Sequence, residues 1–279
     1  MEFLKGHGTQ NDFVLLPDVD GALELTEARV RALCDRQRGL GADGVLRIVA
    51  AARVPGVESA AEWFMDYRNA DGSIAEMCGN GVRVFVRYLV EAGLAKPGEF
   101  SIATRAGDRR VELAAGDPAG TVTVEMGTAR VFGESAATIA GRSLPGLAVD
   151  VGNPHLVCPL DDTELDLASL DLSAAPGHDP VVFPHGVNVE FTRSLGADEL
   201  RMRVHERGVG ETRSCGTGTV AAVAAALHRA GRTAAEVAVH IPGGTVVVGV
   251  HDDGETTLTG PAVLLAHGEL SAQWWAEQV

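Results

Sequence analysis

Two short motifs of the form Cys-Gly-x-Gly divide this chain of 279 residues into two similar halves. The first begins at Cys78 and the second at Cys215, 137 residues later, and each precedes an apolar segment of helical periodicity that stops at a glycine. Asn11 and Asn153, which lie 142 residues apart, each open a strand-like segment. Several matched features at nearly one offset predict an internal duplication, and therefore two domains of roughly 140 residues.

Strand-like segments outnumber helical ones, which predicts an α+β protein. Segments rich in Val, Ile and Phe predict strands over residues 13–16, 45–49, 63–67, 122–126, 156–157, 187–191 and 245–250. Helices are predicted over 26–38 with a stop at Gly39, over 81–92, over 217–230 and, in a short form, over 161–170. On the second helix Arg83, Arg87 and Glu91 are expected on the polar face, with Arg87 and Glu91 paired.

Composition and charge exclude several classes of function. The net charge of −15 makes nucleic acid an unfavourable partner, because an acidic surface repels phosphate. No run approaches the roughly 18 apolar residues that cross a bilayer, and residues 1–6 lack the basic and apolar regions of a signal peptide. We therefore expect a cytoplasmic protein with no membrane partner and with reduced cysteines.

Each Cys-Gly-x-Gly motif places a thiol at the start of a helix. The unpaired N–H groups there favour a thiolate, and they also form a cradle for a carboxylate. Two such turns around one carbon would let one thiol remove a proton and the other return a proton on the opposite face. Cys34, inside a predicted helix, and Cys158, at the end of a predicted strand, are interpreted as packing residues.

The motifs closely resemble those of diaminopimelate epimerases. The two cysteine motifs with their flanks, residues 77–83 and 206–218, carry the resemblance. Residues 6–13, 39–44, 69–73, 152–155 and 186–188 match in the same order, so the likeness covers about residues 3 to 265.

This resemblance implies two pseudo-symmetric α/β domains, each a mainly antiparallel sheet wrapped around a central helix, with the active site in the cleft between them. The N-terminal domain would comprise 1–127 plus 264–279, and the C-terminal domain 128–263. The implied reaction converts L,L-2,6-diaminopimelate to the meso isomer in lysine and peptidoglycan precursor synthesis, by a homodimer, with no cofactor and no metal.

The resemblance also assigns roles to residues of this chain. Cys78 and Cys215 would be the catalytic acid and base, and His155 would support the site. The groups that bind the reacting α-carboxylate would be Gly79, Asn80, Gly216 and Thr217. The distal amino-acid group would be bound by Asn11, Asn69, Asn153, Asn188, Glu206 and Arg207. Arg207 suits a carboxylate and Glu206 an ammonium group.

Several other functions have to be compared with this one. A proline-type racemase shares the two cysteines, but its first motif resembles Cys-Gly-His, where this chain has Asn80. A racemase of histidine or another large amino acid is the closer alternative. A thiol redox enzyme commonly has its cysteines close in sequence, and a non-catalytic binding protein would need no thiols.

The two-thiol interpretation generates a redox prediction. Two thiols flanking one carbon would be near enough to form a disulfide when the site is empty. We expect air-aged enzyme to lose activity and dithiothreitol to restore it. An inactive sample whose intact mass shows four free thiols would contradict this.

Overall fold

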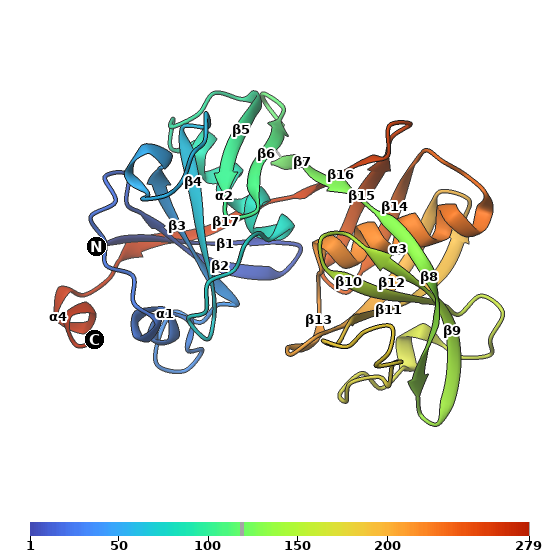
Figure 1. Cartoon of the computed structure of the whole chain (residues 1–279). Coiled ribbons are helices and arrows are strands. Elements are labelled where there is room, and N and C mark those ends of the chain that lie inside the picture. The colour runs from blue at the N-terminus through green and yellow to red at the C-terminus, as the bar shows by residue number, and fades with distance from the viewer. Residues whose placement is uncertain (118–119, 279) are drawn as a thin grey trace. The chain divides into compact units, whose positions relative to one another are not determined.

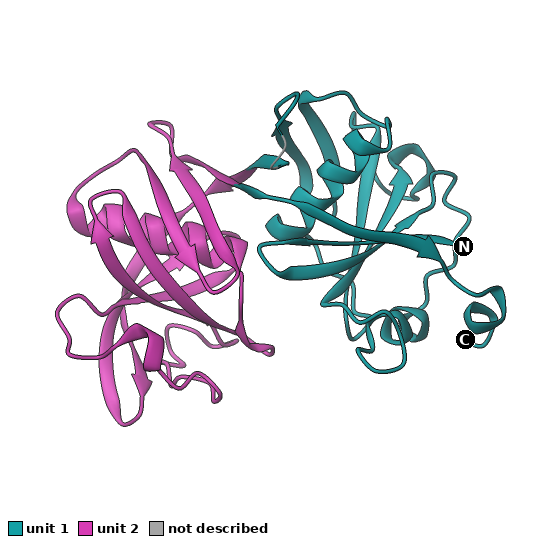
Figure 2. Ribbon diagram, turned by 180° about the vertical axis from the view of Figure 1, so that it is seen from behind, with its two compact units in different colours: residues 1–124, 260–279 teal, residues 125–259 magenta. Residues whose placement is uncertain are grey.

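The computed structural model describes residues 1–117 and 120–278. Residues 118–119 and 279, which belong to the expected N-terminal domain, lie outside the described residues. The chain divides into two compact units (Figures 1 and 2). Unit 1 comprises Met1–Val124 and Gly260–Val279, and unit 2 comprises Glu125–Thr259. The limits of the N-terminal domain expected from sequence, 127 and 264, fall three and four residues later than the observed limits, 124 and 260. The described residues contain no helix that is long and apolar enough to span a membrane.

Unit 1 is built on eight strands. Hydrogen bonding places them in the order β17-β1-β2-β3-β4-β5-β6-β7, with parallel pairing only at β2–β3 and β4–β5 among the described residues. The strands are β1 (Glu2–Gly8), β2 (Asn11–Pro17), β3 (Gly44–Ala50), β4 (Trp63–Asn69), β5 (Gly98–Thr104), β6 (Gly107–Leu113), β7 (Thr121–Thr128) and β17 (Val263–Glu269).

Unit 2 repeats this pattern. Its order is β8-β9-β10-β11-β12-β14-β15-β16, again parallel at the third and fifth pairings, and the short β13 pairs with β12. The strands are β8 (Arg130–Ile139), β9 (Arg142–Asp150), β10 (Pro154–Pro159), β11 (Asn188–Gly196), β12 (Glu199–Glu206), β13 (Gly210–Thr212), β14 (Ala235–Ile241), β15 (Gly244–Val250) and β16 (Glu255–Pro261). The predicted strand segments all fall within or overlap these strands.

One buried helix forms the centre of each unit, as the sequence predicted. α2 (Gly79–Glu91) packs against β1 to β4, β6 and β17, and α3 (Gly216–Ala230) packs against β8 to β12, β14 and β15 (Figure 1). Both helices bury residues around their circumference, as expected for a helix enclosed by a sheet. The glycines predicted to end them, Gly93 and Gly231, both have left-handed φ values, 72° and 65°.

The prediction for the first helix was wrong at its C-terminal end. α1 (Glu27–Cys34) begins after its Thr26 cap but ends four residues before Arg38. The cause is Asp35, whose carboxylate accepts hydrogen bonds from the backbone N–H groups of Gln37 and Arg38 and so turns the chain away from the helix. The predicted 161–170 helix is also wrong, because only the 3-10 turn η2 (Leu167–Ser169) forms there.

Two further elements of unit 1 escaped the sequence analysis, the 3-10 turn η1 (Ala51–Arg53) and the terminal helix α4 (Ala272–Ala276). The residues around α4 pack on the cluster beside α1, where the Arg29 guanidinium lies 4.7 Å from the ring centre of Trp275. These contacts attach the C-terminal segment to the unit that contains the N-terminus.

The left-handed end of α3 gives a stability prediction. Replacing Gly231 with Ala forces a Cβ into a left-handed conformation and should lower the free energy of unfolding by about 1–2 kcal/mol. Gly133 is a matched control, since it has no left-handed φ and an added Cβ meets nothing within 4 Å. Urea denaturation that finds Gly133→Ala as damaging as Gly231→Ala would contradict this account of the cap.

Candidate active site

Cys78 is the N-terminal cap of α2, in extended conformation at φ −145° and ψ 116°. Its sulfur accepts the N–H of Gly81 at 3.5 Å, and its S–H donates to Asn11 Oδ1 at 3.6 Å. The thiol is half-buried. Space at Gly81 is tight, because a Cβ there would lie 3.2 Å from Leu46 Cδ2.

A chain of polar groups runs behind Cys78 from a buried cation to a carboxylate. Arg83 donates to Asn80 Oδ1 at 2.9 Å, Asn80 Nδ2 donates to Asn11 Oδ1 at 3.1 Å, and Asn11 Nδ2 donates to Asp43 at 2.8 Å. A guanidinium can only donate and a carboxylate can only accept, so the two ends fix the orientation of both amides. The structure therefore brings the predicted residues Asn11, Cys78 and Asn80 together in one polar cluster.

Arg83 corrects the sequence analysis, which expected it on a solvent face. Its side chain is fully buried, and burial lowers the pKa of the guanidinium to about 10, although a negative charge on Cys78 acts in the opposite direction. It forms no ion pair with a carboxylate of the described residues, and it also donates to Thr9 Oγ1 at 3.0 Å. A helical period alone could not reveal this, because Arg83 is four residues before Arg87, which is partly exposed, and the strands that enclose Arg83 are distant in sequence. The expected Arg87–Glu91 pair is confirmed at 3.2 Å.

The turn beside this cluster is strained. Thr9 and Gln10, which join β1 to β2, have φ values of 48° and 65° without being glycine. Such conformations cost free energy and persist only where surrounding contacts impose them.

Asp12, two residues beyond Gln10, is paired with Lys5 at 2.6 Å and with Arg36 at 2.8 Å. Burial raises the pKa of this carboxyl, but these two cations outweigh burial and hold it at about 2.

Cys215 caps α3 in nearly the same backbone conformation, at φ −126° and ψ 114°. Its thiol is only 6% exposed, and its sulfur lies 3.7 Å from Thr217 Oγ1. Burial, then the carboxylates of Glu206 and Glu190, raise the pKa of this thiol well above its usual value. The expectation that the helix N-terminus lowers both thiol pKa values is therefore wrong for Cys215, because desolvation and two acidic neighbours outweigh it.

A second polar chain lies beside Cys215. Asn153 Nδ2 donates to Thr217 Oγ1 at 3.4 Å, and Asn153 Oδ1 lies 3.0 Å from His155 Nε2. On its other side, His155 Nδ1 lies 2.7 Å from Glu190 Oε1. His155 and Glu190 are both fully buried. Asn153 and His155 were predicted from the sequence, whereas Glu190 was not, because its only signal is a charge inside an apolar strand.

Three predicted residues gather at the ends of β11 and β12. Asn188 Oδ1 accepts the backbone N–H of Arg207 at 2.9 Å, and the Arg207 guanidinium donates to the carbonyl of His185 at 3.0 Å. Glu206 accepts the hydroxyl of Thr212. Asn188 is also the register partner of His155 in the β10–β11 pair, which places these residues at the same end of the sheet as the second polar chain.

Asn69 is hydrogen-bonded within its own turn and not to the cluster of Asn11, Cys78 and Asn80. Its amide donates to Ser73 Oγ at 3.0 Å in the turn after β4. Strand register still places it at the sheet end that holds Asn11, because Gly44 pairs with both Asn69 and Phe13. No group of three or more His, Cys, Asp or Glu side chains within residues 1–117 and 120–278 is arranged to hold a metal ion.

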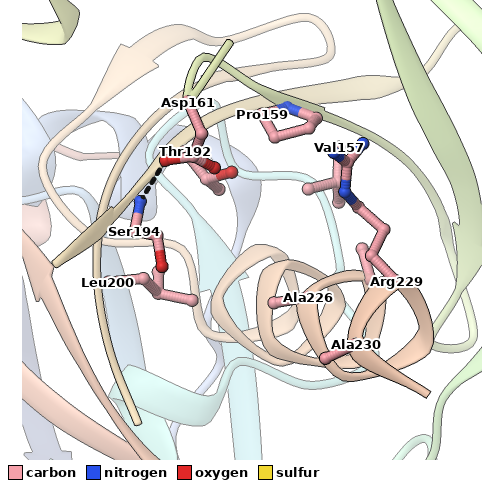
Figure 3. A pocket seen from close by; sticks show the side chains of 10 residues that line it. Val157, Pro159, Asp161, Thr192, Ser194, Leu200, Ala226, Arg229 and Ala230 are labelled. Carbon is pink, nitrogen blue, oxygen red and sulfur yellow. Dashed lines mark hydrogen bonds between the residues drawn. The ribbon is translucent and has the colours of Figure 1, made fainter. Parts of the chain in front are cut away.

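A pocket of about 290 Å³ in unit 2 lies away from this chemistry. It is lined by the C-terminal part of α3, including Ala226 and Arg229, and by the β10–β11 region, where Ser194 N donates to Asp161 at 2.8 Å (Figure 3). Cys215 is at the opposite end of α3. The thiol is therefore outside this pocket.

Comparison with known proteins identifies the family. The model of a family described as diaminopimelate epimerase matches residues 3–132 and 147–265. The chain therefore belongs to the diaminopimelate epimerase family. Within this family, a protein of Rhodococcus jostii (strain RHA1) named diaminopimelate epimerase is 56% identical over 286 residues, 99% of each chain. A protein of the same name from Mycolicibacterium smegmatis is 56% identical over 288 residues, 99% of this chain and 98% of that one.

Solved structures share the fold at low sequence identity. A hydroxyproline epimerase from Agrobacterium vitis has a TM-score of 0.69 at 17% identity, over 97% of this chain and 90% of that chain. A PhzF-family phenazine biosynthesis protein of Bacillus anthracis also scores 0.69, at 16% identity over 97% and 99%. The diaminopimelate epimerase family thus shares with them a mixed sheet with few helices.

The burial of the four thiols predicts their order of reaction. Burial raises the pKa of Cys34 and of Cys158 to about 12, and Cys215 is also buried with a raised pKa, whereas Cys78 is half-buried. The thiolate is the reactive form. Iodoacetamide at pH 8 should therefore modify Cys78 first.

Peptide mass mapping over a time course measures this order, and urea-unfolded protein, in which all four thiols should react at similar rates, is the control. Modification of Cys34 or Cys158 as fast as Cys78 would contradict the assignment.

Proposed function

We propose that this protein epimerises L,L-2,6-diaminopimelate to the meso isomer without a cofactor, using Cys78 and Cys215 as a two-thiol acid/base pair. The observation that carries the proposal is the repeated construction of a cysteine-capped helix, one in each unit, within a full-length match to the diaminopimelate epimerase family. The product serves lysine and peptidoglycan precursor synthesis in this proposal. The homodimer and the cytoplasmic location implied by the resemblance stay predictions.

The proton balance of the reaction needs one thiolate and one thiol. The thiolate takes the α-proton, so an S–H bond forms while the C–H bond breaks and its electron pair passes toward the carboxylate. The other thiol then gives its proton to the opposite face of the carbon. The two sulfurs exchange protonation states, and no oxidant, reductant or net proton is consumed. Each correctly positioned acid or base increases the reaction rate by about 10²–10⁴-fold.

The helix N-termini supply the charge stabilisation that this step needs. Cysteine is a weak cap, so the first N–H groups of α2 and α3 stay available for an anion better than they would behind Ser or Asp. In the proposal, Gly79, Asn80, Gly216 and Thr217 hold the reacting α-carboxylate there. Oriented N–H dipoles in a water-poor site stabilise negative charge as it develops.

The remaining polar residues fit the distal end of the substrate, which is itself a zwitterion. Arg207 matches the distal carboxylate and Glu206 the ammonium group, while Asn11, Asn69, Asn153 and Asn188 offer donors and acceptors to either. His155 supports the site through Asn153. A cyclic substrate has no distal group, so in a proline-type racemase Arg207 and these asparagines would have no substrate group to bind. A histidine-type racemase is the alternative on the same fold.

Internal duplication accounts for both halves of this arrangement. The two units have the same strand order and the same two parallel pairings, and in each a cysteine-capped helix comes after the fifth strand of that order, β4 or β12. This supports the interpretation of two pseudo-symmetric domains. Asn11 and Asn153 then occupy matched positions at the start of their strands, and so do Cys78 and Cys215.

The test is proton exchange at the α-carbon. Wild-type protein with L,L-diaminopimelate in D2O and reductant should give meso product carrying deuterium at one α-carbon, measured by NMR and chiral chromatography. Cys78→Ala and Cys215→Ala should each lower turnover by about 10²–10⁴-fold. Cys34→Ala, which removes a buried packing thiol, is the matched control and should stay active. Absence of exchange with the wild type would reject this substrate and direct the search to histidine or proline.

A further inference from the structure

Glu190 is a buried carboxyl whose role the two-thiol reaction does not explain. Its side chain has no exposure, and its Oε1 lies 2.7 Å from His155 Nδ1, while Oε2 has no partner among the described residues. Burial raises the pKa of this carboxyl, although the nearby His155 opposes the change. A buried polar pair with an unsatisfied oxygen is costly, so its presence in a core needs an explanation.

The duplicated unit supplies an internal control for this cost. Strand register matches His155 and Asn188 in unit 2 with Phe13 and Gly44 in unit 1. Two residues further along the second strand, Glu190 therefore corresponds to Leu46. The same fold thus accommodates an apolar pair, Phe13 and Leu46, where unit 2 has His155 and Glu190.

Contacts at the helix starts agree with this correspondence. A Cβ built on Gly81 would lie 3.2 Å from Leu46 and 3.6 Å from Phe13, whereas a Cβ built on Gly218 would lie 2.6 Å from Glu190 Oε1. Both glycines are the third residue after their cysteine. The fold itself therefore does not require the polar pair, and the site beside Cys215 is the feature that distinguishes unit 2.

The hydrogen-bond chain shows what the pair can do. The Asn153 amide donates from Nδ2 to Thr217, so its oxygen Oδ1 faces His155 Nε2. His155 Nε2 must therefore carry a proton to form a hydrogen bond with Asn153 Oδ1. A second proton is shared between Nδ1 and Glu190 Oε1. The pair is net neutral whichever atom holds that proton, and in both forms Nε2 remains a donor.

We propose that Glu190 is a positioning residue for epimerisation, which holds the Nε2–H form of His155 and thereby, through Asn153, fixes the Thr217 hydroxyl beside the Cys215 thiol. Without Glu190 the imidazole could present a lone pair at Nε2. The Asn153 amide would then turn, and the donor that now meets Thr217 would be lost.

Other titratable groups face the same region and have to be considered. They are Glu206 on β12, the Cys215 thiol at the start of α3, and Cys158 on β10, whose thiol pKa is raised first by burial and also by Glu190. None of them carries a positive charge. His205 on β12 is the register partner of Val189, next to Glu190, but the imidazole in direct contact with Glu190 is His155, so the signals of His155 report the loss of the pair.

The experiment compares Glu190→Gln with Glu190→Leu, and takes Thr192→Val on the same strand as a control. Gln can donate to Nδ1 and keep the Nε2–H form, so it should retain kcat within about threefold. Leu cannot, and kcat should fall roughly 10- to 100-fold, as expected for a displaced reacting group. Thr192→Val, two residues along the same face of β11, should stay at the wild-type value.

A His155→Phe/Glu190→Leu double variant transfers the unit 1 pair into unit 2 and reports on folding. Its melting temperature should equal or exceed that of the wild type, because an apolar pair replaces a buried polar one, although its activity should be lost. A purely structural role for Glu190 predicts the reverse, a melting temperature that falls in parallel with activity.

Imidazole ¹⁵N NMR reads the same state without substrate. Resonances missing in His155→Phe belong to His155, and they should show a protonated Nε2 from pH 6 to 9 in the wild type but a pH-dependent one in Glu190→Leu. This role is assigned within the epimerisation proposed above, but the NMR result separates the two. A wild type inactive on diaminopimelate with Nε2 protonated would reject the substrate alone. An unprotonated Nε2, an unchanged kcat in Glu190→Leu, or a Gln variant as impaired as Leu would overturn the positioning role.

Discussion

The structure depends on how the free backbone N–H groups at the starts of its two central helices, α2 and α3, are hydrogen-bonded. Each central helix begins at its cysteine, and its first N–H groups have no partner within the helix. A Ser, Asp or Asn cap would accept a good hydrogen bond from one of them, yet both helices begin with cysteine. In α2 the sulfur accepts one N–H at the long distance of 3.5 Å, and in α3 the contact of the sulfur is with the Thr217 hydroxyl at 3.7 Å. Helix stability is reduced at both points, and in return the thiol lies where a bound carboxylate would complete the cap.

Side chains of opposite charge lie beside the starts of the two central helices. Behind Cys78 lies the buried guanidinium of Arg83, and beside Cys215 lie the carboxyls of Glu190 and Glu206. A cation favours a thiolate and an anion favours a thiol. The two sulfurs thus have buried neighbours of opposite charge, and for Cys215 burial and the two acidic neighbours raise the pKa of the thiol. This asymmetry fits the proposed reaction, which begins with one thiolate and one thiol.

The main elements of this arrangement could be predicted from sequence. Helical periodicity, the two Cys-Gly-x-Gly motifs and the terminal glycines located α2 and α3 and their caps, because these signals are local. Arg83 and Glu190 could not be placed in this way, since the surroundings of each come from distant strands. A local rule puts such a charge on a solvent face, and only the assembled sheet shows that both side chains are enclosed. The early end of α1 was missed for a local reason, the competition of Asp35 for backbone N–H groups.

The matched strands of the two units carry different side chains at one position beside the central helix. Phe13 and Leu46 in unit 1 pack against Gly81, and His155 and Glu190 take the corresponding places beside Gly218. At matched register of the β2–β3 and β10–β11 pairs, an apolar pair in unit 1 thus corresponds to a hydrogen-bonded polar pair in unit 2. The cost falls on one carboxyl oxygen, Glu190 Oε2, which has no partner among the described residues. Since the sister unit shows that this cost was avoidable on the same backbone, the chemistry beside Cys215 is the physical reason for it.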